Sequence, residues 1–561
     1  MGKTSLSNRI IPTLLLLDGV TCALTAIFAY KFGFDPNATW SRSRFVLLFV
    51  GVTLIFVVVF FYKNPRSSAF VRVLFSENIK ILFLLAHIWA MIFTVYAWFI
   101  TYGNFTAWDH TTHYYTQLAD SFNKGHLYLE RKPSKALLES DPNDPNSRPP
   151  FSDEVWDLSL YKGKFYLYWG PVPALLIAPI QSTLGVKVTD IFLVYFFLAG
   201  LLVFNSLIIL NLWRTFFAEL PAWSAFVCIP LVGFIMPVLW SLNVPNVYEA
   251  AIGAGQFFLI GGVYFALLAF ETNLNTKDTK ATKGKIYLFL AGLFWACSVG
   301  SRAINVLSVI FFAALVSWQV IKDLNRGDTE TLRLKKLRVS VPQRLMLFAF
   351  FAPLIFGALA VGWHNWARFD SPLEFGLRYQ ITIFNLNQHL DWIFRPDYFF
   401  LNLYNYFFQP FNFISGFPFI KPIINTNFPE TYFYAAGPVT GLLFSAPFLI
   451  LAFYAFKKNA STLYSLFIFL LSGSFLINLL TLLFYFFSQT RFLVDLISQI
   501  ALLAVLGYWR IVSSKSKVFI AAANLLLVAT ICVGFLLAFT SETNRIATLN
   551  PQVIKFFGGV P

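Results

Sequence analysis

The segment WDHTTHYYTQLAD, residues 108–120, places the carboxylate of Asp109 and two histidines directly after an apolar run long enough to cross a membrane. A carboxylate held at the membrane edge can act as a general base toward a hydroxyl group. The alternative is that Asp109 only caps the amphipathic helix predicted after it, where apolar side chains recur every four residues. Spacing alone does not separate these two interpretations. His110 and His113 lack a third ligand nearby, so surface histidines are favoured over a metal site.

Further ionisable residues lie inside or at the edges of apolar runs, where charge is costly and indicates function. They are Glu249 in NVPNVYEAAIGAG, Arg302 in VGSRAIN, and Arg491 with Asp495 in SQTRFLVDL. Arg491 and Asp495 are four residues apart on one predicted helix and could simply pair with each other. Arg302 has no oppositely charged neighbour in the sequence. Asp18, within the first apolar run, has no assigned role.

The elements that must position these residues are membrane-spanning helices. The chain has 561 residues, of which 57% are hydrophobic and 12% charged, against about 25% charged in soluble domains. A span needs roughly 20 apolar residues. We therefore predict an all-α polytopic membrane protein, 1–561 forming a single domain of about thirteen helices. The predicted spans are 10–33, 44–62, 79–101, 188–214, 222–242, 249–270, 286–301, 303–322, 345–363, 437–456, 461–487, 492–509 and 518–540.

The distribution of lysine and arginine predicts the orientation, because positive loops stay on the cytoplasmic side. This rule accounts for the net charge of +15, so nucleic acid is not expected as a partner. It directs the loops 102–164 and 364–436 outward. If the proline-broken run 165–185 also crossed, the basic loop 277–285 would face the wrong side. We therefore expect 165–185 to be re-entrant or interfacial, or one of the next three segments not to be a full crossing.

The two predicted outer loops combine the residue types that bind a sugar phosphate. Aromatic faces stack on sugar rings, and arginine forks match phosphate oxygens. Carboxylates and aromatic residues recur in the first loop, and arginines and carboxylates recur in the second. The four cysteines lie within apolar runs without metal-ligand spacing and are predicted to be small core residues.

Several motifs resemble the GT-C superfamily of polytopic glycosyltransferases, which includes lipid A aminoarabinose transferases and protein O-mannosyltransferases. The segments similar to a bacterial glycosyltransferase family 39-like group are YYTQLADSFNKGHLYL (114–129), DPNDP (141–145), DLSLYKGKFYLYWGPVPALL (157–176), YEAAI (248–252), SR (301–302), ARFDSPLEFGLRYQ (367–380) and RFLVD (491–495). In that superfamily an acidic residue begins the first outer loop, and Asp109 occupies this position. One departure is that His110 follows it, where the aminoarabinose and mannose transferases usually have a second acid.

The resemblance implies transfer of a sugar from a polyprenyl-phosphate donor to a glycan, lipid or protein acceptor, outside a bacterial cytoplasmic membrane. Asp109 would be the general base of an inverting displacement, with Asp157 as a possible second carboxylate. If a divalent ion is bound, Mg²⁺ or Mn²⁺ at Asp109 and Asp157 is expected. The residues expected to bind the donor phosphate are Arg302, Arg368, Arg378 and Arg491. The residues expected to bind substrate are Tyr114, Tyr115, Lys164, Tyr168, Glu249 and Glu374.

Two other functions fit much of the pattern. A transporter or flippase of lipid-linked saccharides would also need buried charges, but the chain lacks the repeated halves found in many transporters. A surface-glycan polymerase or ligase would use the same kind of donor. The transferase accounts best for two long outer loops rich in carboxylates.

Overall fold

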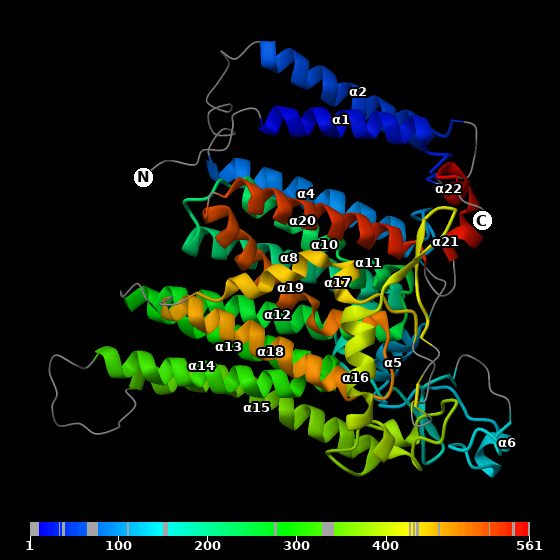
Figure 1. The fold of residues 1–561 in the computed structure, drawn as a ribbon. Helices are drawn as coiled ribbons and strands as arrows, with labels where there is room; N and C mark the ends of the chain where they lie inside the picture. The colour runs from blue at the N-terminus through cyan, green and yellow to red at the C-terminus, as the bar shows by residue number, and fades with distance from the viewer. Residues whose placement is uncertain are drawn as a thin grey trace.

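The structure is a computed structural model, and it is predominantly helical (Figure 1). It describes residues 10–32, 34–35, 40–63, 77–108, 112–149, 155–273, 278–327, 341–425, 428–429, 432, 437–457, 461–514, 516–540 and 545–558. Asp109 and His110 therefore lie outside the described residues.

Long apolar helices make up most of the molecule. Among the described residues, ten are long and apolar enough to cross a membrane, or eleven if one bent pair counts as a span. The predicted all-α polytopic architecture is confirmed. These ten lie in α1 (Ile10–Phe28), α4 (Glu77–Ile100), α8 (Asp190–Phe216), α12 (Val247–Asn273), α13 (Asp278–Ser301), α14 (Val306–Gly327), α15 (Val341–Phe369), α18 (Thr462–Leu483), α19 (Val494–Ser513) and α20 (Lys517–Ala538). A further long helix, α2 (Arg42–Lys63), is not among the ten.

Prolines explain where three predicted apolar segments differ from straight spans. The segment 222–242 forms the short helices α9 (Trp223–Phe226), α10 (Cys228–Phe234) and α11 (Met236–Asn243), with a bend of 41° between α10 and α11. The prediction of one long helix over 437–456 is wrong. That segment forms α17 (Leu442–Ser445) and the 3₁₀ helix η7 (Pro447–Ala455), because Pro447 cannot continue the hydrogen bonding of α17.

The proline-rich run 165–185 contains α7 (Val172–Leu184), which has 13 residues. At 1.5 Å per residue this helix is about 20 Å long, shorter than the roughly 30 Å apolar core of a bilayer. A short helix agrees with the expectation that this run does not make a full crossing.

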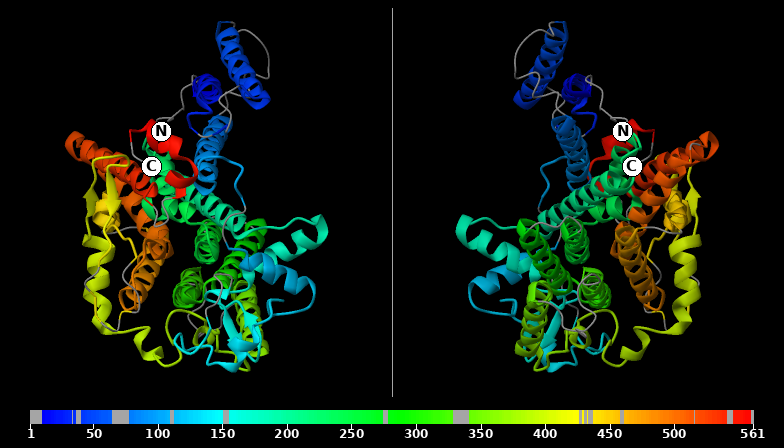
Figure 2. Two further views of the ribbon diagram at one scale, coloured as in Figure 1. Left: turned by 90° about the vertical axis from the view of Figure 1, so that its right-hand side faces the viewer. Right: turned by 90° about the vertical axis from the view of Figure 1, so that its left-hand side faces the viewer.

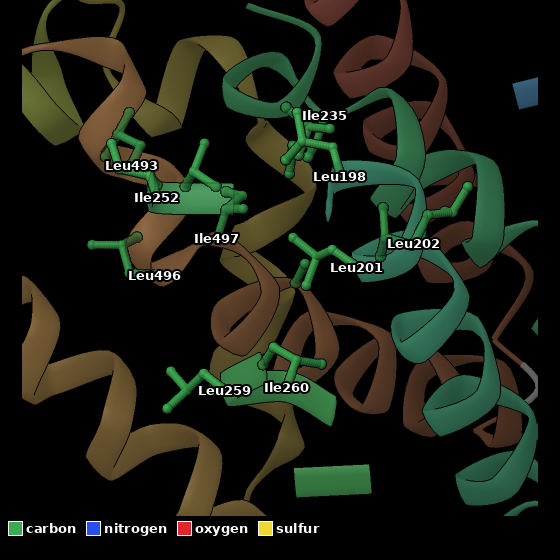
Figure 3. Close-up of a cluster of buried hydrophobic side chains, with 14 of the residues drawn as sticks. Leu198, Leu201, Leu202, Ile235, Ile252, Leu259, Ile260, Leu493, Leu496 and Ile497 are labelled. Atoms are coloured by element: carbon green, nitrogen blue, oxygen red, sulfur yellow. The ribbon is translucent and has the colours of Figure 1, made fainter. Parts of the chain in front are cut away.

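The core lies where α8, α12 and α19 pack together (Figure 3). The most apolar stretch of α19 is buried along its whole length. Lipid tails are as apolar as leucine, so close packing rather than exclusion of water holds such helices together. Gly262 on α12 permits one such close approach, because an added Cβ would collide with the indole of Trp295.

Both predicted outer loops gather at one end of the bundle (Figures 1 and 2). The first contains α5 (Tyr114–Asn123), α6 (Lys135–Glu139) and the antiparallel pair β1 (Ser159–Tyr161) and β2 (Lys164–Tyr166). The second contains η3 (Leu377–Tyr379), η4 (Leu390–Trp392), η5 (Pro396–Tyr398), α16 (Phe399–Leu403), the π-helix η6 (Tyr404–Phe408), β3 (Phe411–Phe413) and β4 (Ile420–Pro422). The short helices α21 (Arg545–Leu549) and α22 (Pro551–Phe556) lie near the same end (Figure 1).

Backbone contacts join the two loops to each other. Ser159 forms a bridge with Gln380, and the Arg148 guanidinium donates to the carbonyl of Thr382. These contacts fix the loops as one layer over the helix ends.

The helices α1 and α2 stand at the edge of the bundle (Figure 2). They pack closely where Gly19 meets Gly51. Asp18, which the sequence left without a role, is hydrogen-bonded through Oδ2 to His87 Nε2 on α4, and the two atoms are 2.6 Å apart. This contact helps to attach the α1–α2 pair to the rest of the molecule.

Candidate functional site

A cavity of about 700 Å³ opens beneath the two outer loops, at the ends of the long helices. Its walls come from the first turn of α12, the α13–α14 junction, α15, α18, the 3₁₀ helix η8 (Thr490–Leu493) and both loops. Five of the residues singled out in the sequence line it: Asp157, Tyr168, Arg302, Arg368 and Arg491. The fold therefore brings together ions that are more than 300 residues apart in the chain.

Two arginine–carboxylate pairs lie at this cavity. Arg302 donates to Asp495 Oδ2 at 2.8 Å, and Asp495 is fully buried. Arg491 NH1 lies 3.7 Å from Glu249 Oε1, and Glu249 is also almost fully buried. Of the two interpretations that the sequence left open for Arg491 and Asp495, mutual pairing is not the one found, because Asp495 pairs with Arg302 and Arg491 pairs with Glu249. The i, i+4 spacing identifies only partners that are close in the sequence, so it could not indicate Glu249 or Arg302.

Both arginines retain donors that no described residue uses. The Nε atoms of Arg302 and Arg491 are buried without a hydrogen-bond partner among the described residues. The Arg491 guanidinium also lies over the ring of Tyr248, 4.3 Å from its centroid. A guanidinium with unused N–H groups at a cavity wall can bind the oxygens of a phosphate.

Glu249 has a second role at the start of α12. Its Oε2 accepts from the backbone N–H of Asn246 at 3.1 Å. A glutamate three residues into a helix that bonds back to the preceding backbone satisfies one of the helix's unpaired N–H groups. This bond fixes the carboxylate, so the position of Arg491 opposite it is also constrained.

Asp157 joins the first outer loop to α12 and to the second loop. Its backbone has φ of +60°, an uncommon conformation for a residue with a side chain. The Tyr248 hydroxyl donates to Asp157 Oδ2, and Thr382 and Gln380 also bond to this carboxylate. Burial raises the pKa of Asp157 above 3.8, while the hydrogen bond from Tyr248 and the charge of Arg491 oppose that shift.

The expected divalent ion finds little support in these contacts. The oxygens of Asp157 are engaged by three hydrogen bonds, and the described residues include no cluster of three or more His, Cys, Asp and Glu side chains. Asp109, the other ligand expected for such an ion, lies outside the described residues, and the mechanism below uses no metal ion.

The helix that follows the Asp109 segment is capped by a different residue. Helix α5 begins at Tyr114, and the side chain of the preceding residue, His113, makes no capping hydrogen bond. Instead Asp190, fully buried at the start of α8, accepts from the backbone N–H of Tyr114 at 3.0 Å and of Tyr115 at 3.1 Å. It also accepts from the Thr112 hydroxyl at 2.7 Å. Asp190 thus satisfies two of the first backbone N–H groups of α5; the capping role considered for Asp109 falls on a residue outside the described part of the chain.

The other predicted substrate residues lie away from the cavity or have their donors in use. Tyr114 and Tyr115 are buried in α5, and the Tyr114 hydroxyl donates to the carbonyl of Trp156. Arg378 pairs with Glu374 at 2.8 Å, and Lys164 lies 4.2 Å from the ring centroid of Tyr128. None of these residues is among those that line the cavity in the described part of the chain.

Arg368 lines the cavity but is held by its neighbours. It donates to the Leu167 carbonyl at 2.6 Å and to Asn365 Oδ1 at 2.8 Å, and it is 4% exposed. These bonds tie α15 to the strand β2 and its following turn, so Arg368 supports the cavity wall.

Sequence reasoning missed Tyr248 and Asp190. Tyr248 stands beside Glu249 in YEAAI and could have been found from that adjacency. Asp190 is a carboxylate at the start of a predicted span, a place where any acid is costly and needs partners. Its partners come from another loop, and no local pattern indicates them.

No protein-family model matches the sequence, and no curated protein matches it. The structure is similar to the oligosaccharyltransferase of Archaeoglobus fulgidus in its apo form, with a TM-score of 0.44, 11% identity and coverage of 82% of this chain. The same enzyme tethered to an acceptor peptide gives a TM-score of 0.44, 12% identity and 84% coverage. This chain spans 56% of the length of that enzyme.

Proposed function

We propose that the protein is a membrane glycosyltransferase that moves a sugar from a polyprenyl-phosphate donor to a hydroxyl acceptor. The observation that carries this proposal is the cavity holding Arg302 and Arg491, each paired on one edge and unpartnered at Nε among the described residues. The leaving group of such a reaction is a lipid phosphate, which needs positive charge rather than a strong acid. The motif resemblance supports the same reaction.

The cavity wall also suits a donor with an apolar tail. Val306 and Leu307, in the first turn of α14, line the cavity and are 40% and 51% exposed on the molecular surface. A prenyl chain could leave the cavity over these residues and stay in the bilayer while its phosphate remains with the arginines. Tyr168 and Trp169 also line the cavity and supply aromatic side chains for contact with a sugar ring.

In this mechanism a carboxylate removes the acceptor proton as the acceptor oxygen attacks the anomeric carbon. A single displacement inverts that centre. The sequence assigns the base to Asp109 first, with Asp157 as the second carboxylate. A general base contributes roughly 10²–10⁴-fold to the rate.

The test is a transfer assay with purified protein in nanodiscs, supplied with polyprenyl-phosphate hexose and pentose donors and a membrane extract as the acceptor source. We expect wild type to consume donor, and the folded fraction of Arg302→Gln and of Arg491→Gln to have lost most of that activity. Arg395→Gln, which removes an arginine paired with Asp397 outside the cavity lining, is the matched control.

Two results would oppose the proposal. Movement of intact donor between leaflets without sugar transfer would identify a flippase. Transfer with retention of anomeric configuration would exclude the single displacement.

A further inference from the structure

We propose that Tyr248 and Asp157 act as one proton-accepting pair, in which Tyr248 takes the acceptor's proton and passes its own to Asp157. This inference rests on the proposed function and deepens it. It assigns the proton to a pair within the described cavity instead of to Asp109.

The placement of Tyr248 carries the inference. It lies in the first turn of α12, lines the cavity, and donates its hydroxyl hydrogen to Asp157 Oδ2. Its ring is held between the guanidinium of Arg491, 4.3 Å from the centroid, and the ring of Trp169, 5.1 Å away at 84°. A tyrosine fixed on two sides presents its hydroxyl in one orientation, as a proton relay requires.

Asp157 is less accessible than the tyrosine that bonds to it. Asp157 is 7% exposed, and Thr382 and Gln380 of the second loop also form hydrogen bonds with its carboxylate. An acceptor hydroxyl in the cavity therefore reaches this base most directly through Tyr248. Arg491 from η8 faces the carboxylate, and Tyr168 lies nearby in the first loop. Burial raises the pKa of Asp157, which makes it a stronger base than an exposed aspartate.

The step balances without a further reactant. The acceptor O–H bond breaks as its oxygen bonds to the anomeric carbon, and that proton goes to Tyr248 Oη. The proton already on Oη goes to Asp157 Oδ2. The bond between the anomeric carbon and the phosphate oxygen breaks, and its electron pair leaves with the phosphate beside Arg302 and Arg491. Asp157 later returns its proton to water through the same tyrosine.

The chain offers a matched control for this pair. The Tyr161 hydroxyl donates to Asp370 Oδ2 at 2.7 Å on the exposed face of the outer loops. This is the same tyrosine–aspartate chemistry, and neither residue lines the cavity in the described structure. Tyr161→Phe and Asp370→Asn therefore control for general effects of losing such a bond.

The experiment measures transfer rates, donor KM and solvent deuterium effects in nanodiscs for wild type, Tyr248→Phe, Asp157→Asn, Asp109→Asn and the two controls. We expect Asp157→Asn, which still accepts from Tyr248, to lower kcat by about 10²–10⁴-fold with little change in KM. Wild type should give a curved dependence of rate on deuterium fraction, because two protons move together. Tyr248→Phe should lower kcat and give a linear dependence.

Near-wild-type kcat in folded Asp157→Asn and Tyr248→Phe, with loss of activity in Asp109→Asn, would overturn the relay and leave the transferase standing. The relay would also be overturned if Tyr248→Phe lowered the rate while wild type and Tyr248→Phe both showed a linear dependence of rate on deuterium fraction. A purely structural role for Tyr248 predicts that result. Absence of transfer in wild type with every donor would instead count against the proposed function itself.

Discussion

Arg302 and Asp495 stand 193 residues apart in the chain and meet at 2.8 Å, with the carboxylate fully buried. The backbone carbonyl of Asp495 also accepts from Asn478 Nδ2 at 2.5 Å. The pair thus links the α13–α14 junction to α19 and α18. It holds one edge of the Arg302 guanidinium, a residue that lines the cavity and whose Nε is buried without a partner among the described residues.

Removing one member of this pair should cost stability. We expect Asp495→Ala to lower the free energy of unfolding by about 3–5 kcal/mol, because it leaves a buried guanidinium without its counter-charge. The double variant Arg302→Met with Asp495→Leu should recover most of that stability and stay inactive. Thermal unfolding in nanodiscs measures both effects. Restored activity in the double variant would show that Arg302 has no role in the reaction.

The two arginines Arg491 and Arg378 should respond differently to the same substitution. Arg491→Gln should raise the donor KM about 10-fold or more, because it removes a charged donor to phosphate. Arg378→Gln should change it less than about twofold, since an exposed pair like that with Glu374 contributes little. Steady-state kinetics with one donor over a concentration series compares them. Equal effects would mean that the second loop moves over the donor when it binds.

The stability of the protein should depend on pH through Asp157. Burial raises the folded-state pKa of Asp157 above 3.8, so the folded protein binds the proton more tightly than the unfolded chain does. This contribution to stability is fully present below about pH 4 and is lost as the pH rises through the folded-state pKa. We therefore expect the melting temperature of wild type minus that of Asp157→Asn, measured from pH 4 to 8, to decrease as the pH rises. A difference independent of pH would contradict this assignment.

Asp190 should control the order of α5. We expect Asp190→Ala to leave the N–H groups of Tyr114 and Tyr115 unpaired, at a cost of about 2 kcal/mol or more. Asp190→Asn should keep most of the stability, because its amide oxygen can still accept. Hydrogen exchange over residues 114–118 measures the opening of this helix. Unchanged exchange in Asp190→Ala would mean that packing alone holds α5 in place.

The sequence predicts the long helices well and their partners poorly. Helix positions follow from local apolar runs, so the bounds of α8, α12, α18 and α20 fall within a few residues of the predicted spans. Partner choice depends on which helices become neighbours, and that information is spread over the whole chain. For this reason the sequence offers Arg491 only the nearby Asp495 as a partner, whereas the fold gives it Glu249 from α12.

The same limit applies to the candidate site. Arg302 and Arg491 stand out in the sequence because ions beside apolar runs are rare and costly, and Asp157 stands out through the motif resemblance; all three line the cavity. The sequence gives no reason to distinguish these three residues from Arg378 or Lys164, which do not line the cavity in the described structure. Only the packing of α12, η8 and the loops makes that distinction.

Thr112 makes two hydrogen bonds with its single hydroxyl group. It donates to Asp190 at 2.7 Å, beside the start of α5, and accepts from the backbone N–H of Val247 at 2.8 Å, at the start of α12. The first turn of α12 also carries Tyr248 and Glu249. A displacement of α5 would therefore change the position of the first turn of α12, which forms part of the cavity wall. The Thr112 hydroxyl therefore couples the position of α5 to the position of the cavity wall.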